Sequence, residues 1–141
     1  MYKRILVAAE NSPTDRAVLD HVQQLARLTG ASLVLVHVAD GWAARNFHEL
    51  NLRESEEMRA DRAYLEQLRA ELSGQGFAVE TRLGLGDPAN EIARVAGEEH
   101  VDLIAMSTHG HRFLKDLLLG ATADRLRHMI NVPVLLVRAK R

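Results

Sequence analysis

Residues 5–9 read Ile-Leu-Val-Ala-Ala, and this short run, together with the segment that follows it, decides the fold. An uninterrupted apolar run of this length is typical of a strand that is buried on both faces of a sheet. Residues 12–15 then read Ser-Pro-Thr-Asp, which predicts a helix start with Ser12 as the N-cap and Pro13 at the first helical position. The pattern therefore predicts a buried strand that turns through a short loop into a helix.

The same alternation continues along the chain. Because strands and helices alternate, the sequence predicts an α/β fold, a single-domain five-stranded parallel sheet with helices on both faces. The alternating apolar and polar residues of the third strand predict that it lies at an edge of the sheet. The later strands are predicted at residues 33–38, 77–83, 103–106 and 134–137. Helices are predicted to end at Gly30, at about Ser73 and at about Met129, with further starts at Asp87 and at about Gly120.

The composition fits one globular domain that covers residues 1–141. Lys and Arg number 18 against 19 Asp and Glu, so the chain has no broad basic surface, and binding to nucleic acid is not expected. Cysteine is absent, which excludes disulfides and thiol nucleophiles and suits a cytoplasmic location. No stretch approaches the ~20 apolar residues that span a bilayer, so no membrane insertion is expected.

Ligands of such sheets bind beyond the carboxyl ends of the strands, at the point where the strand order reverses. The segment Met106–Thr122 follows a predicted strand, leads into a helix and carries Gly110 and Gly120. Gly110 lets the backbone approach a ligand, and the amides from Gly120 onward are expected at a helix start, which favours an anion. With a positive charge from Arg112, a phosphate chain could lie between the glycines. Turn or helix-packing glycines would give the same spacing.

Four segments give the chain a resemblance to a known family. They read MYKRILVAAENSPTDRAV at residues 1–18, LVLVHVAD at 33–40, LGDPANEI at 85–92 and MSTHGHRFLKDLLLGATADRLRHMINVPVLLVR at 106–138. In this order they resemble the universal stress protein family from end to end. The resemblance implies a Rossmann-like sheet of the adenine nucleotide alpha hydrolase type, with strand order 3-2-1-4-5 and, usually, a dimer.

The nucleotide-binding branch of that family has Gly, two residues, Gly, nine residues, Gly, and then Ser or Thr. In this chain Gly110 matches the second glycine and Gly120 matches the third. Ser107 replaces the first glycine, and Ala121 replaces the final Ser or Thr. Glu10 stands where the branch usually has Asp near the adenine. The resemblance thus implies a phosphate frame that is retained and a ribose contact that is altered.

The strand-end positions and the resemblance together define the expected nucleotide site. Its ligand is ATP, AMP or ADP, and Mg²⁺ could accompany the phosphates. No catalytic residue and no protein metal site are expected, because the chain lacks a P-loop, a nucleophile elbow and a zinc-type ligand spacing. His37 falls in a buried strand and is interpreted as a core histidine with satisfied hydrogen bonds. The expected binding residues are Ala8, Ala9, Glu10, Val38, Met106, Ser107, His109, Gly110, His111, Arg112, Gly120, Ala121 and Thr122.

The function predicted from the sequence is a binding module in stress response or signalling, with little or no hydrolysis and an unknown protein partner. Two alternatives stay open: a weak ATPase on the same fold, and a nucleotide-free dimeric scaffold protein. A homodimer is predicted through Val134–Val137, because an apolar sheet edge invites pairing. Trp42–Leu52 is interpreted either as a second partner surface or as packing over the sheet, and Asp40 as a capping or solvated residue.

Overall fold

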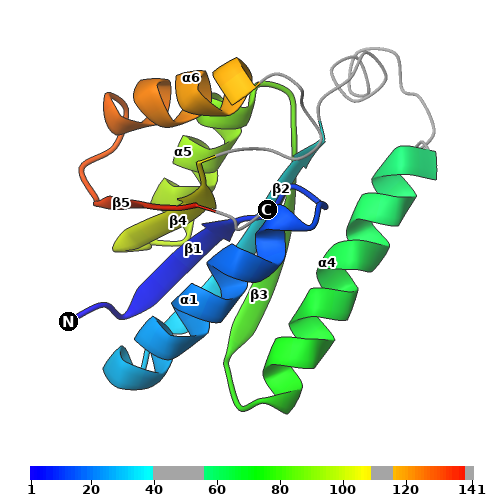
Figure 1. Ribbon diagram of the computed structural model, residues 1–141, viewed down its shortest axis with the longest axis vertical. Helices are drawn as coiled ribbons and strands as arrows, with labels where there is room; N and C mark the ends of the chain where they lie inside the picture. Colours follow the sequence, from blue (N-terminus) through cyan, green and yellow to red (C-terminus); the bar gives the residue numbers. More distant parts are fainter. Residues whose placement is uncertain (40–55, 109–115, 139–141) are drawn as a thin grey trace.

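A computed structural model describes residues 1–39, 56–108 and 116–138 of the chain (Figure 1). Strands and helices alternate through these residues, as the sequence predicts. The predictions for Asp40 and for Trp42–Leu52 lie outside the described residues. The strands are β1 (Arg4–Ala8), β2 (Ser32–Ala39), β3 (Val79–Leu85), β4 (Leu103–Ser107) and β5 (Val134–Val137). The helices are α1 (Thr14–Thr29), α4 (Glu56–Gly74), α5 (Pro88–Glu98) and α6 (Asp116–Arg127).

The five strands form one parallel sheet in the order β3-β2-β1-β4-β5, which confirms the predicted strand order. In the centre of the sheet, Ile5 of β1 lies opposite Leu33 of β2 on one side and Leu103 of β4 on the other. β3 is an edge strand, as predicted, and β5 is the other edge. The strand order therefore reverses between β1 and β4, and the carboxyl ends of these two strands mark the place where folds of this type bind ligands.

Helices cover both faces of the sheet (Figure 1). α1 and α4 bury one face, and α5 and α6 bury the other, so successive residues of β1 and β2 enter opposite cores. Each large apolar side chain that is fully buried contributes about 1.5–3 kcal/mol, so these two cores supply most of the driving force for folding. Within the described ranges, no helix has both the length and the apolarity to cross a membrane.

Two predicted helix ends are confirmed. Gly30 follows α1 with a φ of 73°, a left-handed conformation that glycine adopts without strain, and its N–H bonds to the carbonyl of Ala26. Asp87 caps α5, because its carboxylate accepts a hydrogen bond of 3.0 Å from the N–H of Asn90, and Pro88 is the first helical residue.

Two other helix starts differ from the prediction. Pro13, and not Ser12, occupies the cap position of α1, and it contributes no side-chain hydrogen bond. α6 begins at Asp116 and not at about Gly120, so Gly120 lies inside the helix. An acidic residue favours a helix start through the helix dipole, and one glycine in a helix costs only about 1 kcal/mol. A helix can therefore begin before the glycine and continue through it.

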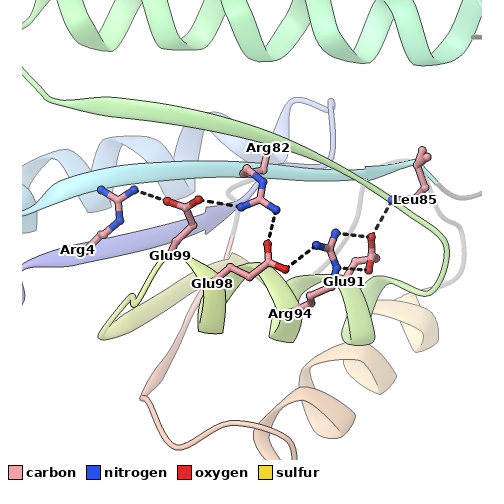
Figure 2. Close-up of polar contacts among 7 residues, drawn as sticks. All are labelled: Arg4, Arg82, Leu85, Glu91, Arg94, Glu98 and Glu99. Carbon is pink, nitrogen blue, oxygen red and sulfur yellow. Dashed lines mark hydrogen bonds and ion pairs between the residues drawn. The ribbon is translucent and has the colours of Figure 1, made fainter.

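Alternating arginines and glutamates join β1 and β3 to α5 (Figure 2). Each of the three arginines contacts two carboxylates, Arg4 pairing with Glu80 as well as Glu99. Glu91 ends the series by accepting a hydrogen bond of 3.1 Å from the N–H of Leu85. Since most of these groups are partly exposed, each pair stabilises the fold only modestly, and the series acts mainly by fixing α5 against the sheet. In order, the series is Arg4, Glu99, Arg82, Glu98, Arg94 and Glu91.

Glu91 provides a pH-dependent test of this series. The hydrogen bond from Arg94 holds the pKa of Glu91 below its ordinary value of 4.5, and the N–H of Leu85 lowers it further. A folded-state pKa below the unfolded-state value means that the ionised carboxylate stabilises the fold above the unfolded value. That stabilisation is lost as the pH falls through the folded-state pKa. We expect Glu91→Gln to lower the free energy of unfolding at pH 7, as measured by urea denaturation.

The difference between wild type and Glu91→Gln should then shrink as the pH falls below 4.5. Glu56→Gln is the matched control, because Glu56 pairs with Arg59 on the surface and its side chain is 88% exposed. A difference between wild type and Glu91→Gln that stays the same at every pH would contradict the assigned role of the carboxylate.

Candidate functional site

The carboxyl ends of β1, β2 and β4 bring three predicted site residues to one face of the sheet. Ala8, Val38 and Met106 all pack against the core on the α5/α6 side. Met106 is fully buried there, whereas Ala8 and Val38 are half-buried. Ala9 follows β1 and is buried on the opposite side, toward α1 and α4. The strand ends therefore offer two half-buried apolar side chains, Ala8 and Val38, next to the buried Met106, at the point where the strand order reverses.

The loop between β1 and α1 is held by one buried carboxylate. Asp15 is only 2% exposed, and it accepts hydrogen bonds from three successive backbone N–H groups. The distances are 2.8 Å from Glu10, 2.9 Å from Asn11 and 3.3 Å from Ser12. Asp15, in the first turn of α1, therefore accepts the hydrogen bonds that hold this loop. The sequence pattern assigns the capping role at this helix start to Ser12 instead. These three amides are no longer free to bind a ligand.

A tyrosine side chain also donates a hydrogen bond to Asp15. The hydroxyl of Tyr64, on α4, donates a hydrogen bond of 2.6 Å to Asp15 Oδ2. Burial raises the pKa of Tyr64 well above its ordinary value, and the hydrogen bond to Asp15 adds to the effect, so the phenol stays a donor at working pH. Glu10 Oε2 accepts a hydrogen bond of 2.9 Å from the hydroxyl of Thr14. This end of the sheet is therefore rich in carboxylates, and the loop N–H donors are already used.

His37 has the buried core position that the sequence predicts, but only its Nδ1 has the expected hydrogen bond. It is 3% exposed, and its Nδ1 lies 2.7 Å from the carbonyl oxygen of Ala9. Its Nε2 lies 3.1 Å from Asp61 Oδ2, and Asp61 Oδ1 accepts a hydrogen bond of 2.9 Å from the side-chain amide of Asn11. The sequence reading singled out neither Asp61 nor Asn11. A signal for Asp61 exists, because an acidic residue there interrupts the apolar face of α4.

Polar groups also gather at the end of β4. Ser107 is 2% exposed and pairs with Val137 of β5. Thr108 follows, its N–H bonds to the carbonyl of Val137 at 3.1 Å, and its buried hydroxyl has no hydrogen-bond partner within the described ranges. On α6, Thr122 is half-buried. Arg125 binds Asp87 at 2.8 Å, which fixes α6 to the start of α5.

The glycine segment is only partly described. His109, Gly110, His111 and Arg112 lie outside the described residues, so their predicted roles stay predictions. Gly120 and Ala121 lie within α6. The expectation of free amides from Gly120 onward is wrong, because a helix leaves unpaired N–H groups only in its first turn, which here starts at Asp116.

A pocket of about 350 Å³ opens between α1 and α4, beside the β1–α1 loop. Of the described residues that the sequence predicts for nucleotide binding, none lines it. No group of three His, Asp or Glu side chains in the described part of the chain could hold a metal ion. The pocket is lined by Asn11, Ser12, Pro13, Arg16, Leu19 and Tyr64.

The sequence was compared with known families and proteins. The universal stress protein family model matches residues 1–138. The chain belongs to the universal stress protein family. Among its relatives, Universal stress protein MJ0577 of Methanocaldococcus jannaschii is 32% identical over 160 residues, which span 99% of this chain and 97% of that protein. Universal stress protein YxiE of Bacillus subtilis is 28% identical over 148 residues, spanning 98% of this chain and 100% of that protein.

Solved structures of family members share the fold. The structure of protein MJ0577 has a TM-score of 0.83 at 32% identity and covers 100% of this chain and 99% of its own. A universal stress protein in complex with cAMP has a TM-score of 0.68 at 19% identity, over 96% of both chains. The universal stress protein from Archaeoglobus fulgidus in complex with dAMP has a TM-score of 0.69 at 23% identity, over 96% of this chain and 98% of that one.

The role of Asp15 leads to a stability prediction. In Asp15→Asn, the side chain loses a charge and one acceptor oxygen, while three backbone N–H groups and the Tyr64 hydroxyl still point at it. We expect the free energy of unfolding to fall by roughly 2–3 kcal/mol, because buried donors are left without an acceptor. Urea denaturation measures the change. Asp20→Asn, at an exposed position of the same helix, is the control and should change stability little. An equal effect of both variants would refute the assignment.

Proposed function

We propose that this member of the universal stress protein family binds an adenine nucleotide (ATP, ADP or AMP) at the carboxyl edge of β1, β2 and β4. It would act through the bound state in stress response or signalling, with little or no hydrolysis. The observation that carries the proposal is the pair of half-buried apolar residues Ala8 and Val38, next to the buried Met106 and beside the acceptor-rich β1–α1 loop, where the strand order reverses. Two family members of known structure hold cAMP and dAMP, which supports the ligand class.

The base is proposed to lie at the β1–β2 end of this edge. An adenine ring is flat and apolar on its faces, which suits contact with Ala8 and Val38. Its edge carries an amino donor, and a ribose carries hydroxyl donors, which suit the carbonyl and carboxylate acceptors near Glu10. A phosphate would be disfavoured here, because Asp15 already occupies the N–H groups of Glu10, Asn11 and Ser12 and adds its own negative charge.

The phosphates are proposed to lie at the β4–α6 end. This end has a hydroxyl donor in Thr108, which is buried and has no hydrogen-bond partner in the described part of the chain. The following residues supply Gly110 and the cation Arg112, and Thr122 lies further along on α6. Weak turnover is consistent with this set, since a P-loop lysine and a positioned general base are missing from the sequence.

The direct experiment is identification of the nucleotide. Purified protein would be denatured, released nucleotides identified by mass spectrometry, and ATP, ADP, AMP and cAMP titrated into stripped protein by calorimetry. The proposal expects saturable binding of at least one adenine nucleotide with a stoichiometry of one per chain. Absence of binding by all four would favour the nucleotide-free scaffold protein. Steady phosphate release from ATP would instead favour the weak ATPase.

Ser107 provides a mutational test of the β4 end. The nucleotide-binding branch of the family is expected to have glycine here, so we expect Ser107→Gly to tighten ATP binding severalfold by removing the Cβ. Calorimetry with ATP measures the change. Ser73→Gly, at an exposed position near the end of α4, is the control and should leave the affinity unchanged. Weaker binding by Ser107→Gly would mean that the serine hydroxyl is itself a ligand contact.

The proposed homodimer through β5 can be tested without disturbing the core. Leu135 and Val137 pack against the core on the α1/α4 side, whereas Leu136 is 46% exposed at the edge of the sheet. If two β5 edges pair, Leu136→Lys brings two like charges together, and we expect light scattering to show a shift from dimer to monomer. Leu28→Lys is the control, because Leu28 is 85% exposed at the far end of α1. A dimer that survives Leu136→Lys would place the interface elsewhere.

A further inference from the structure

Three polar groups that lie far apart in the sequence meet under the β1–α1 loop. His37 comes from β2, Asp61 from α4 and Asn11 from the loop itself. The side chains of His37 and Asp61 are 3% and 1% exposed. Both lie on the α1/α4 side of the sheet, away from Ala8, Val38 and Met106, so they would act on a nucleotide only through the loop.

The contacts fix how many protons the His37–Asp61 pair must hold. The carbonyl oxygen of Ala9 can only accept a hydrogen bond, so His37 Nδ1, which lies 2.7 Å away, must carry a proton. His37 Nε2 and Asp61 Oδ2 have no hydrogen-bond partner in the described residues, and they lie 3.1 Å apart in an ion-pair contact. A bare Nε2 facing a carboxylate would bury two acceptors against each other. The pair therefore needs one further proton, either on Nε2 or on Oδ2.

Asn11 connects this pair to the loop. Its backbone has a φ of 60°, a left-handed conformation in which asparagine is more common than most residues. Its N–H bonds to Asp15 Oδ2, and its side-chain amide bonds to Asp61 Oδ1, both at 2.9 Å. The loop is thus held from α1 by one buried carboxylate and from α4 by another.

We propose that His37, Asp61 and Asn11 are positioning residues for the nucleotide site, and that the proton held between His37 and Asp61 keeps the loop in its binding shape. This inference rests on the proposed function. It links the site to α4, because movement of Asp61 would release both Asn11 and His37.

Few other charges bear on this pair. From α1 the nearest buried charge linked to it is Asp15, which reaches it only through Asn11. From α4, Tyr64 stays protonated as a donor to Asp15. From the loop, the Glu10 carboxylate accepts from the hydroxyl of Thr14. From β3, the residue in register with His37 is the apolar Leu83. The contact that holds the loop from α4 is therefore that of Asn11 with the His37–Asp61 pair.

The decisive comparison is between two variants at Asp61. Asp61→Ala removes the partner of both Asn11 and His37, and we expect ATP and AMP binding to weaken by about tenfold or more. In Asp61→Asn, the amide oxygen can accept from Asn11 and the amide N–H can donate to a neutral His37, with no shared proton needed. We expect this variant to keep wild-type affinity within about threefold.

The controls separate positioning from a general loss of fold. Glu66→Ala removes a surface carboxylate of the same helix, which pairs with Arg69, and should leave the affinity unchanged. Should Asp61→Ala not fold, Asn11→Gly replaces it, because glycine keeps the left-handed backbone and removes only the side-chain amide. Wild-type affinity in a folded Asp61→Ala or Asn11→Gly protein would overturn the proposal. So would an Asp61→Asn variant as weak as Asp61→Ala.

A readout without nucleotide keeps this inference separate from the proposed function. Nitrogen-15 NMR of the His37 ring should show a proton on Nδ1, the nitrogen that faces the carbonyl of Ala9. Backbone amide exchange at Asn11 and Ser12 should be faster in Asp61→Ala than in wild type. An unprotonated Nδ1, or amide exchange at Asn11 and Ser12 that is equally fast in wild type and Asp61→Ala, would overturn the positioning role. Failure of wild-type protein to bind any of ATP, ADP, AMP and cAMP would overturn the proposed function. The exchange result would still test the loop contacts, because it is measured without nucleotide.

Discussion

The structure depends on how the chain leaves its central strand. β1 is buried on both faces, and within six residues the backbone leaves the sheet and enters α1. The N–H groups of this short connection need hydrogen-bond acceptors, because a buried N–H without one is costly. The Asp15 carboxylate meets this constraint by accepting from Glu10, Asn11 and Ser12 at once. Because α4 also reaches this carboxylate through Tyr64, the interaction sets the position of two helices as well as the loop. The candidate site is built on the resulting edge.

The hydrogen bonds of Asp15 also make the β1 end of this sheet edge chemically different from the β4 end. A helix start in an α/β sheet usually attracts anions, since its first N–H groups are free. Here the start of α1 lies beside the carboxylates of Asp15 and Glu10, and the loop amides before it are already bonded. The β1 end is therefore suited to donors such as an amino group or a hydroxyl. The β4 end carries Ser107 and Thr108, and the cation Arg112 follows them in the sequence. The proposed site thus has a β1 end that favours the base and ribose and a β4 end that favours the phosphates.

The sequence predicts the parts of the fold that depend on local patterns. Buried apolar runs predict the strands, Gly30 and Asp87 mark helix ends, and the family resemblance supplies the strand order. The start of α1 was misread because Ser12 and Asp15 are both good acceptors near a helix start, and only the fold shows which one faces the amides. Gly120 was misread because glycine can lie within a helix as well as begin one. The contact between Asn11 and Asp61 spans 50 residues, so no local pattern reveals it.

A signal for that contact is nevertheless present on α4. Met58, Leu65, Leu68 and Leu72 form its buried stripe, and Asp61 falls at the same helical spacing. A charged residue on such a stripe has to meet a polar partner inside the fold, because burying it alone would cost several kcal/mol. β2 has one polar side chain in its run from 33 to 38, namely His37. Two polar residues, each alone on an apolar surface that faces the other element, are therefore expected to pair, and this argument from the sequence could have located the buried contact before the structure was known.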